Sequence, residues 1–234
     1  MSARVEVWHA DAASETLLAS ALGPHAGWSR RELGKVVTDH RSSWVRRVEA
    51  GTTCFYVKTY DYARLRDRWR GVARTTWLAP SRAARERDAL QWLIAHGFPG
   101  PRPLALLEAR GLAFLRRAVL VTEAWDGLRL DHLLPQLAPR QRDACLHELS
   151  RFVHRLHAAG FRDRNLDLRN VLGRAAGDGF VLAKIDSPRY RLASPGVQVD
   201  RWVQADRMRL AASLATLGLE LPEVAPDTRQ RADA

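Results

Sequence analysis

A polar segment at residues 161–172 constrains the fold more than any other part of this sequence. It reads Phe-Arg-Asp-Arg-Asn-Leu-Asp-Leu-Arg-Asn-Val-Leu, which places Asp, Asn and Arg side chains close together in one loop. A long amphipathic helix is predicted to end before it at Gly160, because glycine commonly ends a helix. An apolar hairpin follows the segment and ends at Asp186. Oxygen-bearing side chains in this order suit a hard cation such as Mg²⁺ with phosphates bound to it.

Length and composition limit the class of protein. A chain of 234 residues can form one substantial core or two small lobes. No apolar run approaches the ~20 residues of a membrane-spanning helix, and the first residues lack the apolar stretch of a secretory signal. Cys54 and Cys145 lie far apart without the spacing of a zinc site, which predicts reduced thiols. We therefore expect a cytoplasmic protein.

The chain is strongly basic, with a formal net charge of +11. Nearly all of the basic residues are arginine, since Lys35, Lys58 and Lys184 are the only lysines. A GC-rich coding sequence and attraction to a polyanion both explain this bias, and the composition does not separate them. The densest basic run, residues 64–70, has apolar residues at helical spacing, so its arginines are most simply the exposed side of a short helix.

Residues 35–60 have the alternating pattern of β-strands, and two hairpins in series predict a small antiparallel sheet. Alternation places Lys58 on the face of the last strand opposite Phe55 and Val57. A lysine on an edge strand, exposed to water, is the alternative interpretation. The strands are predicted at residues 36–37, 44–48 and 53–60, with a polar turn at residues 38–43.

A helix is predicted over residues 81–96. Its apolar stripe includes Leu90, and Glu86 lies about one turn earlier on the same face. A buried carboxylate needs a partner, because an unpaired buried charge is strongly unfavourable. The strand lysine Lys58 is the candidate partner, and a surface pair between Glu86 and Arg82 is the alternative.

The second half of the chain is predicted to be mainly helical. Asp206 lies in line with the apolar stripe of its last helix, where it would accept hydrogen bonds from backbone N–H groups of a neighbouring loop. The alternative is a surface aspartate near Arg207 or Arg209. Further strands are predicted at residues 104–107 and 118–122, a hinge at residues 123–127, helices at residues 140–159 and 199–217, and a disordered tail after Pro222.

These segments, in this order, resemble the lipopolysaccharide kinase family (the Kdo and heptose kinases), a branch of the protein-kinase-like fold. The resemblance runs from about Val36 to Leu217. It implies an α+β, two-lobed fold, with an N-terminal lobe of a small antiparallel β-sheet and one helix over residues 1–123. Residues 124–234 would form a C-terminal helical lobe with the catalytic loop. The implied activity is ATP-dependent and Mg²⁺-dependent transfer of phosphate to a sugar hydroxyl of a lipopolysaccharide-core-like acceptor.

The resemblance also assigns roles to individual residues. Phe55-Tyr56-Val57-Lys58 is similar to the family's strand with the phosphate-contacting lysine, and Glu86 to the glutamate that pairs with that lysine. The run ending at Glu123 is similar to the hinge, where adenine would bind backbone groups. Asn170 and Asp186 fall at the positions of the two metal ligands. Likewise, Asp206 resembles the carboxylate that braces the catalytic loop.

The chain departs from the family pattern within the catalytic loop. Asn165 stands where the family has the aspartate that accepts the proton of the substrate hydroxyl, and an amide cannot act as that base. Asp167 and Asp163 are the other candidates for the role. No Gly-rich phosphate loop is present, so residues 38–43 would have to replace it. Little chain follows Asp186, so we expect no long activation segment and no protein substrate.

Two other functions remain compatible with the sequence. Asn165 makes a pseudokinase plausible, which would bind nucleotide or a partner without transferring phosphate. The net charge suggests a basic nucleic-acid-binding protein, but no platform of aromatic and basic residues supports it. The expected partners are a small-molecule or glycolipid acceptor and, peripherally, the anionic inner face of a membrane. Nucleic acid is not expected.

Overall fold

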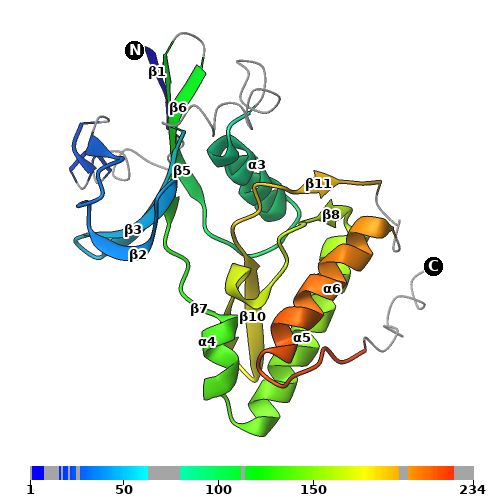
Figure 1. The fold of residues 1–234 in the computed structure, drawn as a ribbon. Coiled ribbons are helices and arrows are strands. Elements are labelled where there is room, and N and C mark those ends of the chain that lie inside the picture. The colour runs from blue at the N-terminus through cyan, green and yellow to red at the C-terminus, as the bar shows by residue number, and fades with distance from the viewer. Residues whose placement is uncertain are drawn as a thin grey trace. The chain divides into compact units, whose positions relative to one another are not determined.

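The computed structural model describes residues 2–7, 16, 18–20, 22–24, 27–62, 80–111, 114–194 and 200–223. The chain divides into two compact units: unit 1 is Met1–Ala95 with Pro101–Trp125, and unit 2 is His96–Gly100 with Asp126–Ala234 (Figure 1). This division differs from the predicted lobes by two residues at the hinge and by the short segment 96–100. The predicted basic helix around residues 64–70 and the tail at residues 224–234 lie outside the described residues.

Unit 1 is organised around a six-stranded antiparallel sheet with the strand order β1-β5-β6-β4-β3-β2. The strand that contains Lys58, β4, pairs with β3 on one side and β6 on the other, so Lys58 does not lie on an edge strand. The elements of this unit are β1 (Ser2–Val7), β2 (Lys35–His40), β3 (Ser43–Ala50), β4 (Thr53–Asp61), α3 (Arg82–Ala95), β5 (Pro103–Gly111) and β6 (Phe114–Glu123).

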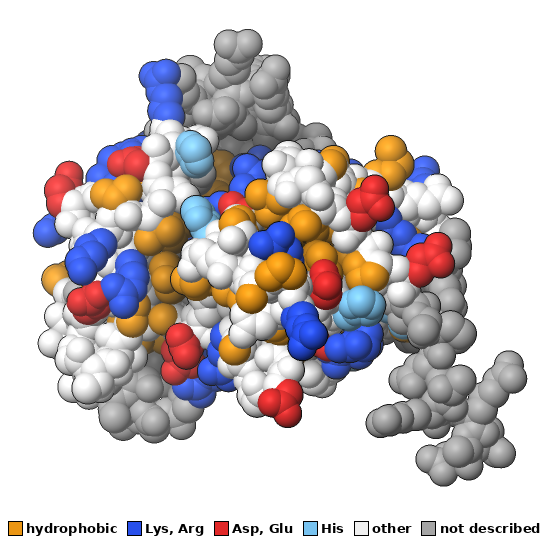
Figure 2. Space-filling view, turned by 90° about the horizontal axis from the view of Figure 1, so that it is seen from below, with side chains coloured by type: hydrophobic (Ala, Val, Ile, Leu, Met, Phe, Trp, Pro, Cys, Tyr) orange, Lys and Arg blue, Asp and Glu red, His pale blue; other side chains and the backbone are white. Residues whose placement is uncertain are grey.

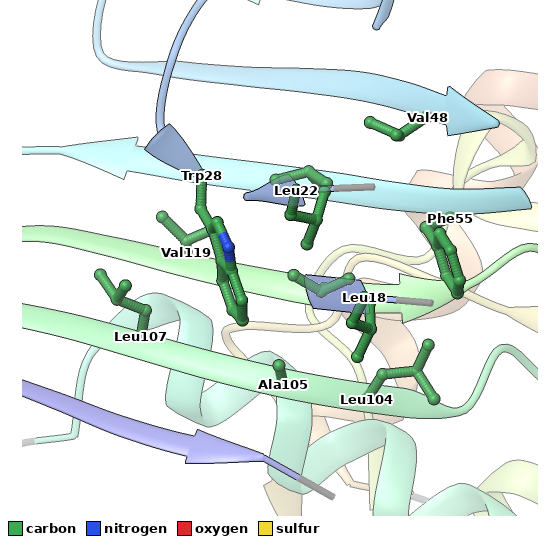
Figure 3. Close-up of a cluster of buried hydrophobic side chains, with 11 residues drawn as sticks. Leu18, Leu22, Trp28, Val48, Phe55, Leu104, Ala105, Leu107 and Val119 are labelled. Carbon is green, nitrogen blue, oxygen red and sulfur yellow. The ribbon is translucent and has the colours of Figure 1, made fainter. Parts of the chain in front are cut away.

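The two faces of this sheet are covered by different parts of the chain. On one face, Trp28, Leu18 and Leu22 pack against side chains of the central strands, including Phe55 (Figure 3). On the other face, the small residues and Leu90 of α3 pack against β5 and β6. Because side chains alternate along a strand, Phe55 and Val57 face the first cluster, whereas Lys58 and Tyr60 face α3.

The first hairpin has a shorter turn than the sequence predicts. Strand β2 continues to His40 and β3 begins at Ser43, so most of the predicted turn at residues 38–43 is paired strand. The buried guanidinium of Arg46 explains the extension, because it donates hydrogen bonds to the carbonyl oxygen of Thr38 at 3.1 Å and to the carboxylate of Asp39 at 2.8 Å. These bonds also hold the pKa of Asp39 below its ordinary value.

Unit 2 combines two long helices with short strands. Helix α5 packs against β10 of a three-stranded sheet with the order β10-β9-β7, and β11 pairs with β8. The segment 96–100 belongs to this unit because Phe98 packs edge-on against Phe152 of α5, with ring centroids 5.8 Å apart. The elements are β7 (Leu128–Arg129), α4 (Leu130–Leu133), η2 (Leu134–Gln136), α5 (Pro139–Ala158), β8 (Phe161–Arg162), η3 (Leu168–Asn170), β9 (Val171–Ala176), β10 (Gly179–Lys184), β11 (Arg191–Leu192) and α6 (Arg201–Ala215).

The surface carries its charge in patches. On the face shown in Figure 2, Lys and Arg side chains lie in several separate groups with Asp and Glu side chains between them. Among the described residues of this face, the basic side chains therefore do not form one continuous band. Across the described parts of the chain, no helix combines the length and the hydropathy needed to cross a bilayer.

Gly160 fixes how the chain leaves α5 and enters the polar segment. Its φ of +93° lies in the left-handed region, and a Cβ added there would lie 2.3 Å from the carbonyl oxygen of Ala193. A hydrogen bond holds the two backbone segments this close, since the carbonyl oxygen of Gly160 accepts the N–H of Ala193 at 2.9 Å. Only glycine satisfies both requirements without displacing the backbone.

We predict that Gly160→Ala lowers the free energy of unfolding by about 2 kcal/mol or more, because it adds a steric clash to a left-handed backbone conformation. Chemical denaturation would measure the loss. Gly177→Ala is the matched control, since Gly177 also has a positive φ, +55°, but has nothing within 4 Å of an added Cβ. Equal losses of unfolding free energy in the two variants would show that the contact with Ala193 does not cause the destabilisation.

Candidate functional site

Lys58 and Glu86 form an ion pair inside unit 1. The Nζ atom of Lys58 lies 2.8 Å from Oε2 and 3.0 Å from Oε1 of Glu86. The predicted pairing between the strand lysine and the helix carboxylate is therefore confirmed, and the alternative of a surface pair with Arg82 is wrong. The pair is largely shielded from solvent, with side-chain exposures of 19% for Lys58 and 7% for Glu86.

A second donor completes the environment of Glu86. The hydroxyl of Tyr60 donates a hydrogen bond of 2.8 Å to Oε2, and Tyr60 lies two residues after Lys58 on the same face of β4. The ammonium of Lys58 also lies 5.4 Å from the centroid of the Tyr60 ring. A buried carboxylate with two donors is stabilised in its charged form. The ammonium is thereby held on the α3 side of the sheet, with 19% of the Lys58 side chain exposed.

In unit 2, the carboxylate of Asp206 holds the polar loop that follows α5. Its side chain is fully buried and accepts the backbone N–H groups of Asp163 at 2.9 Å and Arg164 at 2.7 Å. The Nε2 atom of His157 lies 3.4 Å from the same carboxylate. The prediction that Asp206 accepts N–H groups of a neighbouring loop is confirmed. The loop is therefore fixed at the point where it leaves β8.

Asn165, Asn170 and Asp186 are joined by hydrogen bonds. The side-chain amide of Asn170 donates to the carbonyl oxygen of Asn165 at 2.9 Å. The amide of Asn165 in turn donates to the carbonyl oxygen of Asp186 at 2.9 Å and to its Oδ2 at 3.2 Å. Asp186 has a φ of +57°, which is uncommon for a non-glycine residue outside functional sites. Thus the two predicted metal ligands lie close to one another in this unit.

Asn170 and Asp186 carry side-chain oxygen atoms, which are the ligands that a hard cation such as Mg²⁺ binds. Among the described residues, no group of three or more His, Cys, Asp and Glu side chains is placed to hold a metal. Asn170 and Asp186 offer only a few oxygen ligands. Mg²⁺ commonly takes one or two protein ligands and completes its shell with phosphate oxygens and water.

Asp163 is enclosed in an ion pair that the sequence did not reveal. Its Oδ2 lies 3.0 Å from Nζ of Lys184, and both side chains are almost fully buried, at 2% and 0% exposure. Burial raises the pKa of Asp163, and the neighbouring Lys184 opposes that rise. The pair joins the start of the polar loop to the last residue of β10, two residues before Asp186. The sequence indicates this ion pair only through the position of Lys184, which lies on the apolar face of β10 beside Leu182.

Asp167 has a local structural role in the same loop. It caps η3 by accepting the N–H of Arg169 at 3.0 Å, and it also pairs with the guanidinium of Arg169 at 3.0 Å. The guanidinium is well exposed, so this ion pair lies nearer to solvent than the Asp163–Lys184 pair. Of the two candidate carboxylates, Asp167 is therefore the more accessible.

Glu123 ends β6, and most of its polar groups are already engaged. Its N–H donates to the carbonyl oxygen of Arg102 at 2.9 Å, and its carboxylate binds the guanidinium of Arg102 at 2.8 and 3.1 Å. The next N–H, that of Ala124, donates to Cys54 at 2.9 Å. A contact between adenine and Glu123 would therefore have to use its carbonyl oxygen.

A model of the lipopolysaccharide kinase (Kdo/WaaP) family matches residues 34–229. The chain belongs to this family. The resemblance drawn from the sequence is thus confirmed for the family as a whole.

Individual relatives and a solved structure agree with this assignment. A 3-deoxy-D-manno-octulosonic acid kinase of Xanthomonas oryzae pv. oryzae (strain PXO99A) is 36% identical over 157 residues, which are 65% of this chain and 56% of the relative. The kinase of the same name from Xanthomonas campestris pv. campestris (strain B100) is 34% identical over 152 residues, 64% of this chain and 54% of the relative. The family member described here spans about half the length of these curated relatives.

The structure of WaaP in complex with acyl carrier protein is similar in fold, with a TM-score of 0.55 and 18% sequence identity. The match covers 90% of this chain and 80% of that chain. The predicted α+β, two-lobed protein-kinase-like fold is confirmed.

The Asp163–Lys184 pair yields a stability prediction. Lys184→Met leaves a buried carboxylate without its cation, so we expect a loss of about 3–5 kcal/mol at neutral pH. In this variant the pKa of Asp163 rises further above its unfolded value. Stability is then greatest at acidic pH, where the carboxyl group is protonated in both states, and it falls as the pH rises through the folded pKa.

Urea denaturation at acidic and neutral pH would measure this dependence. Asp163→Asn in the Lys184→Met background removes the unpaired charge and should restore part of the stability at neutral pH. A double variant as unstable as Lys184→Met alone would show that the loss arises from packing rather than from charge.

Proposed function

We propose that the chain is an ATP-dependent phosphotransferase that acts on a sugar hydroxyl of a lipopolysaccharide-core-like acceptor. The observation that carries the proposal is the Lys58–Glu86 ion pair. It lies inside unit 1 of a chain that belongs to the lipopolysaccharide kinase family. A buried ion pair contributes little net stability. Its presence is better explained by a need for a fixed ammonium group that faces an anionic ligand.

In this proposal the residues described above have separate roles in nucleotide binding. Lys58 binds the α- and β-phosphates of ATP, Glu86 orients Lys58, and the carbonyl oxygen of Glu123 contacts adenine. Asn170 and Asp186 would hold Mg²⁺, which would supply neutralisation of phosphate charge. The acceptor hydroxyl attacks the γ-phosphorus, the bond to the bridging oxygen breaks, and ADP leaves.

The hydroxyl proton requires an acceptor, and Asp167 is the better candidate of the two carboxylates in the polar loop. Asn165 lacks a basic group. Both carboxylates are paired with a cation, but the partner of Asp167 is the exposed Arg169, whereas the partner of Asp163 is the fully buried Lys184. Phosphoryl transfer depends mainly on positioning and charge neutralisation, so a modest base is sufficient. The proposed acceptor is a small sugar or a glycolipid, and a glycolipid acceptor would be met at the anionic, cytoplasmic face of a membrane.

Transfer of radiolabelled phosphate from ATP to a glycolipid that contains 3-deoxy-D-manno-octulosonic acid tests the proposal. Lys58→Ala and Asp186→Ala should each lower the rate by about 100-fold or more, because each removes charge stabilisation of the transferred group. Lys35→Ala is the matched control, since Lys35 is an exposed lysine whose recorded partner is Glu49 at 3.7 Å. Equal rates in all three variants would refute the proposed roles.

A pseudokinase is the second candidate, and Asn165 is the observation that favours it. The substitution Asn165→Asp separates the two functions. It replaces the amide that donates to Asp186 with a second carboxylate, at a site where the two groups now lie 3.2 Å apart. Without Mg²⁺ we expect a loss of about 1–2 kcal/mol from repulsion, and saturating Mg²⁺ should remove that loss.

With Mg²⁺ and ATP, an active phosphotransferase should transfer phosphate faster after Asn165→Asp, because the variant regains a proton acceptor. Thermal unfolding and the transfer assay measure the two effects, with Asp167→Asn as the comparison. Nucleotide binding without transfer in both the wild type and Asn165→Asp would favour the pseudokinase.

A further inference from the structure

Three arginines surround one tryptophan in unit 2. The guanidinium carbons of Arg164, Arg201 and Arg191 lie 4.2, 4.7 and 4.8 Å from the centroid of the Trp202 ring. They come from three different segments: the polar loop after β8, the first turn of α6, and β11. We call this set the Trp202 cluster.

Two members of the Trp202 cluster, Arg191 and Arg201, are positively charged and exposed. In the described part of the chain, no carboxylate forms an ion pair with Arg191 or Arg201. Asp200, which precedes the cluster in sequence, is already bound to Arg162 at 2.9 Å and to the first N–H groups of α6. Each cation–π contact at an exposed site contributes only about 0.5–1 kcal/mol, while the like charges of Arg191 and Arg201 repel one another. An anion would relieve that repulsion.

The backbone that supports the Trp202 cluster is held in place by contacts within the protein. Arg191 pairs with Arg162 in the β11–β8 ladder, and the neighbouring Tyr190 stacks on Phe161 with ring centroids 5.4 Å apart. The N–H of Arg164 is fixed by Asp206 at 2.7 Å. A site that is organised before binding loses less conformational entropy when a ligand arrives.

The Trp202 cluster also adjoins the candidate catalytic loop. Arg164 immediately precedes Asn165, whose amide contacts Asp186. Guanidinium groups recognise carboxylates and phosphates through paired N–H donors. The relatives of this chain are named for an acidic sugar, and a carboxylate on the acceptor would distinguish that sugar from a neutral one.

We propose that the Trp202 cluster binds the carboxylate of the acceptor sugar and so selects an acidic acceptor. This inference rests on the proposed function, because it locates the acceptor's acidic group beside the loop that performs the transfer. Arg191 and Arg201, both exposed, supply the donors. Trp202 keeps them oriented, and Arg164 links the site to the loop.

Saturation kinetics test the inference with the double variant Arg191→Gln/Arg201→Gln. We expect the KM for an acceptor that contains 3-deoxy-D-manno-octulosonic acid to rise about tenfold or more, because charge-assisted hydrogen bonds are lost. The KM for ATP should not change, and the loss should fall on the acceptor KM rather than on kcat. Arg191→Lys/Arg201→Lys should recover part of the affinity, since it restores charge without the guanidinium fork.

The control is Arg207→Gln/Arg209→Gln, which removes two exposed arginines of the same helix that have no recorded contact with Trp202. An equal rise in KM in the control would overturn the inference, because general surface charge would then explain the effect. A fall in kcat at unchanged acceptor KM would also overturn it.

Calorimetric titration without ATP separates this inference from the proposed function. Free 3-deoxy-D-manno-octulosonic acid should bind the wild type and bind the double variant about tenfold or more weakly, whether or not phosphate transfer is detected. The carboxamide of the same sugar should bind neither protein well. If the carboxamide or inorganic phosphate binds the wild type as tightly as the acid does, the cluster does not select a sugar carboxylate. Equal binding of the acid to both proteins would likewise exclude the site.

Discussion

The contact between the buried carboxylate of Asp206 and two backbone N–H groups determines the geometry of the polar loop. Arg164 has a φ of +59°, and its N–H is one of the two groups that Asp206 accepts. A left-handed backbone at a non-glycine residue costs free energy, and it persists only where the surroundings compensate for it. Asp206 provides that compensation from α6. Asp206 thereby fixes the backbone immediately before Asn165.

The parts of the site that the sequence predicts correctly share a physical signature, which is a charged residue on an apolar stripe. Glu86 lies one turn from Leu90, and Asp206 lies in line with the apolar residues of α6. Because an unpaired buried carboxylate is so unfavourable, such a position implies a partner even when the partner is distant in sequence. The same periodicity predicted the helices α3 and α5 to within two residues at each end.

The features that the sequence could not predict depend on contacts between segments. Nothing near Asp163 indicates that Lys184 will neutralise it, because the pair forms only when β10 lies against the loop. Tyr60 resembles any other aromatic residue of a strand until α3 brings Glu86 to it. The Trp202 cluster likewise requires β11 to pair with β8. The predicted turn of the first hairpin is too long because the prediction did not expect Arg46 of β3 to be buried. Arginine is a residue type that is rarely buried.

Asn165 cannot accept a proton as a carboxylate would, but its side-chain amide can donate hydrogen bonds. A carboxylate at this position would accept a proton from a substrate, but it would also repel Asp186 whenever the metal is absent. The amide instead donates to both the carbonyl oxygen and the carboxylate of Asp186, so that residue is held in its left-handed conformation by the protein alone. The loop thereby has a fixed Asp186 carboxylate in place of a base at position 165. Such an exchange is compatible with phosphoryl transfer, because in that reaction positioning and charge neutralisation contribute more than proton removal.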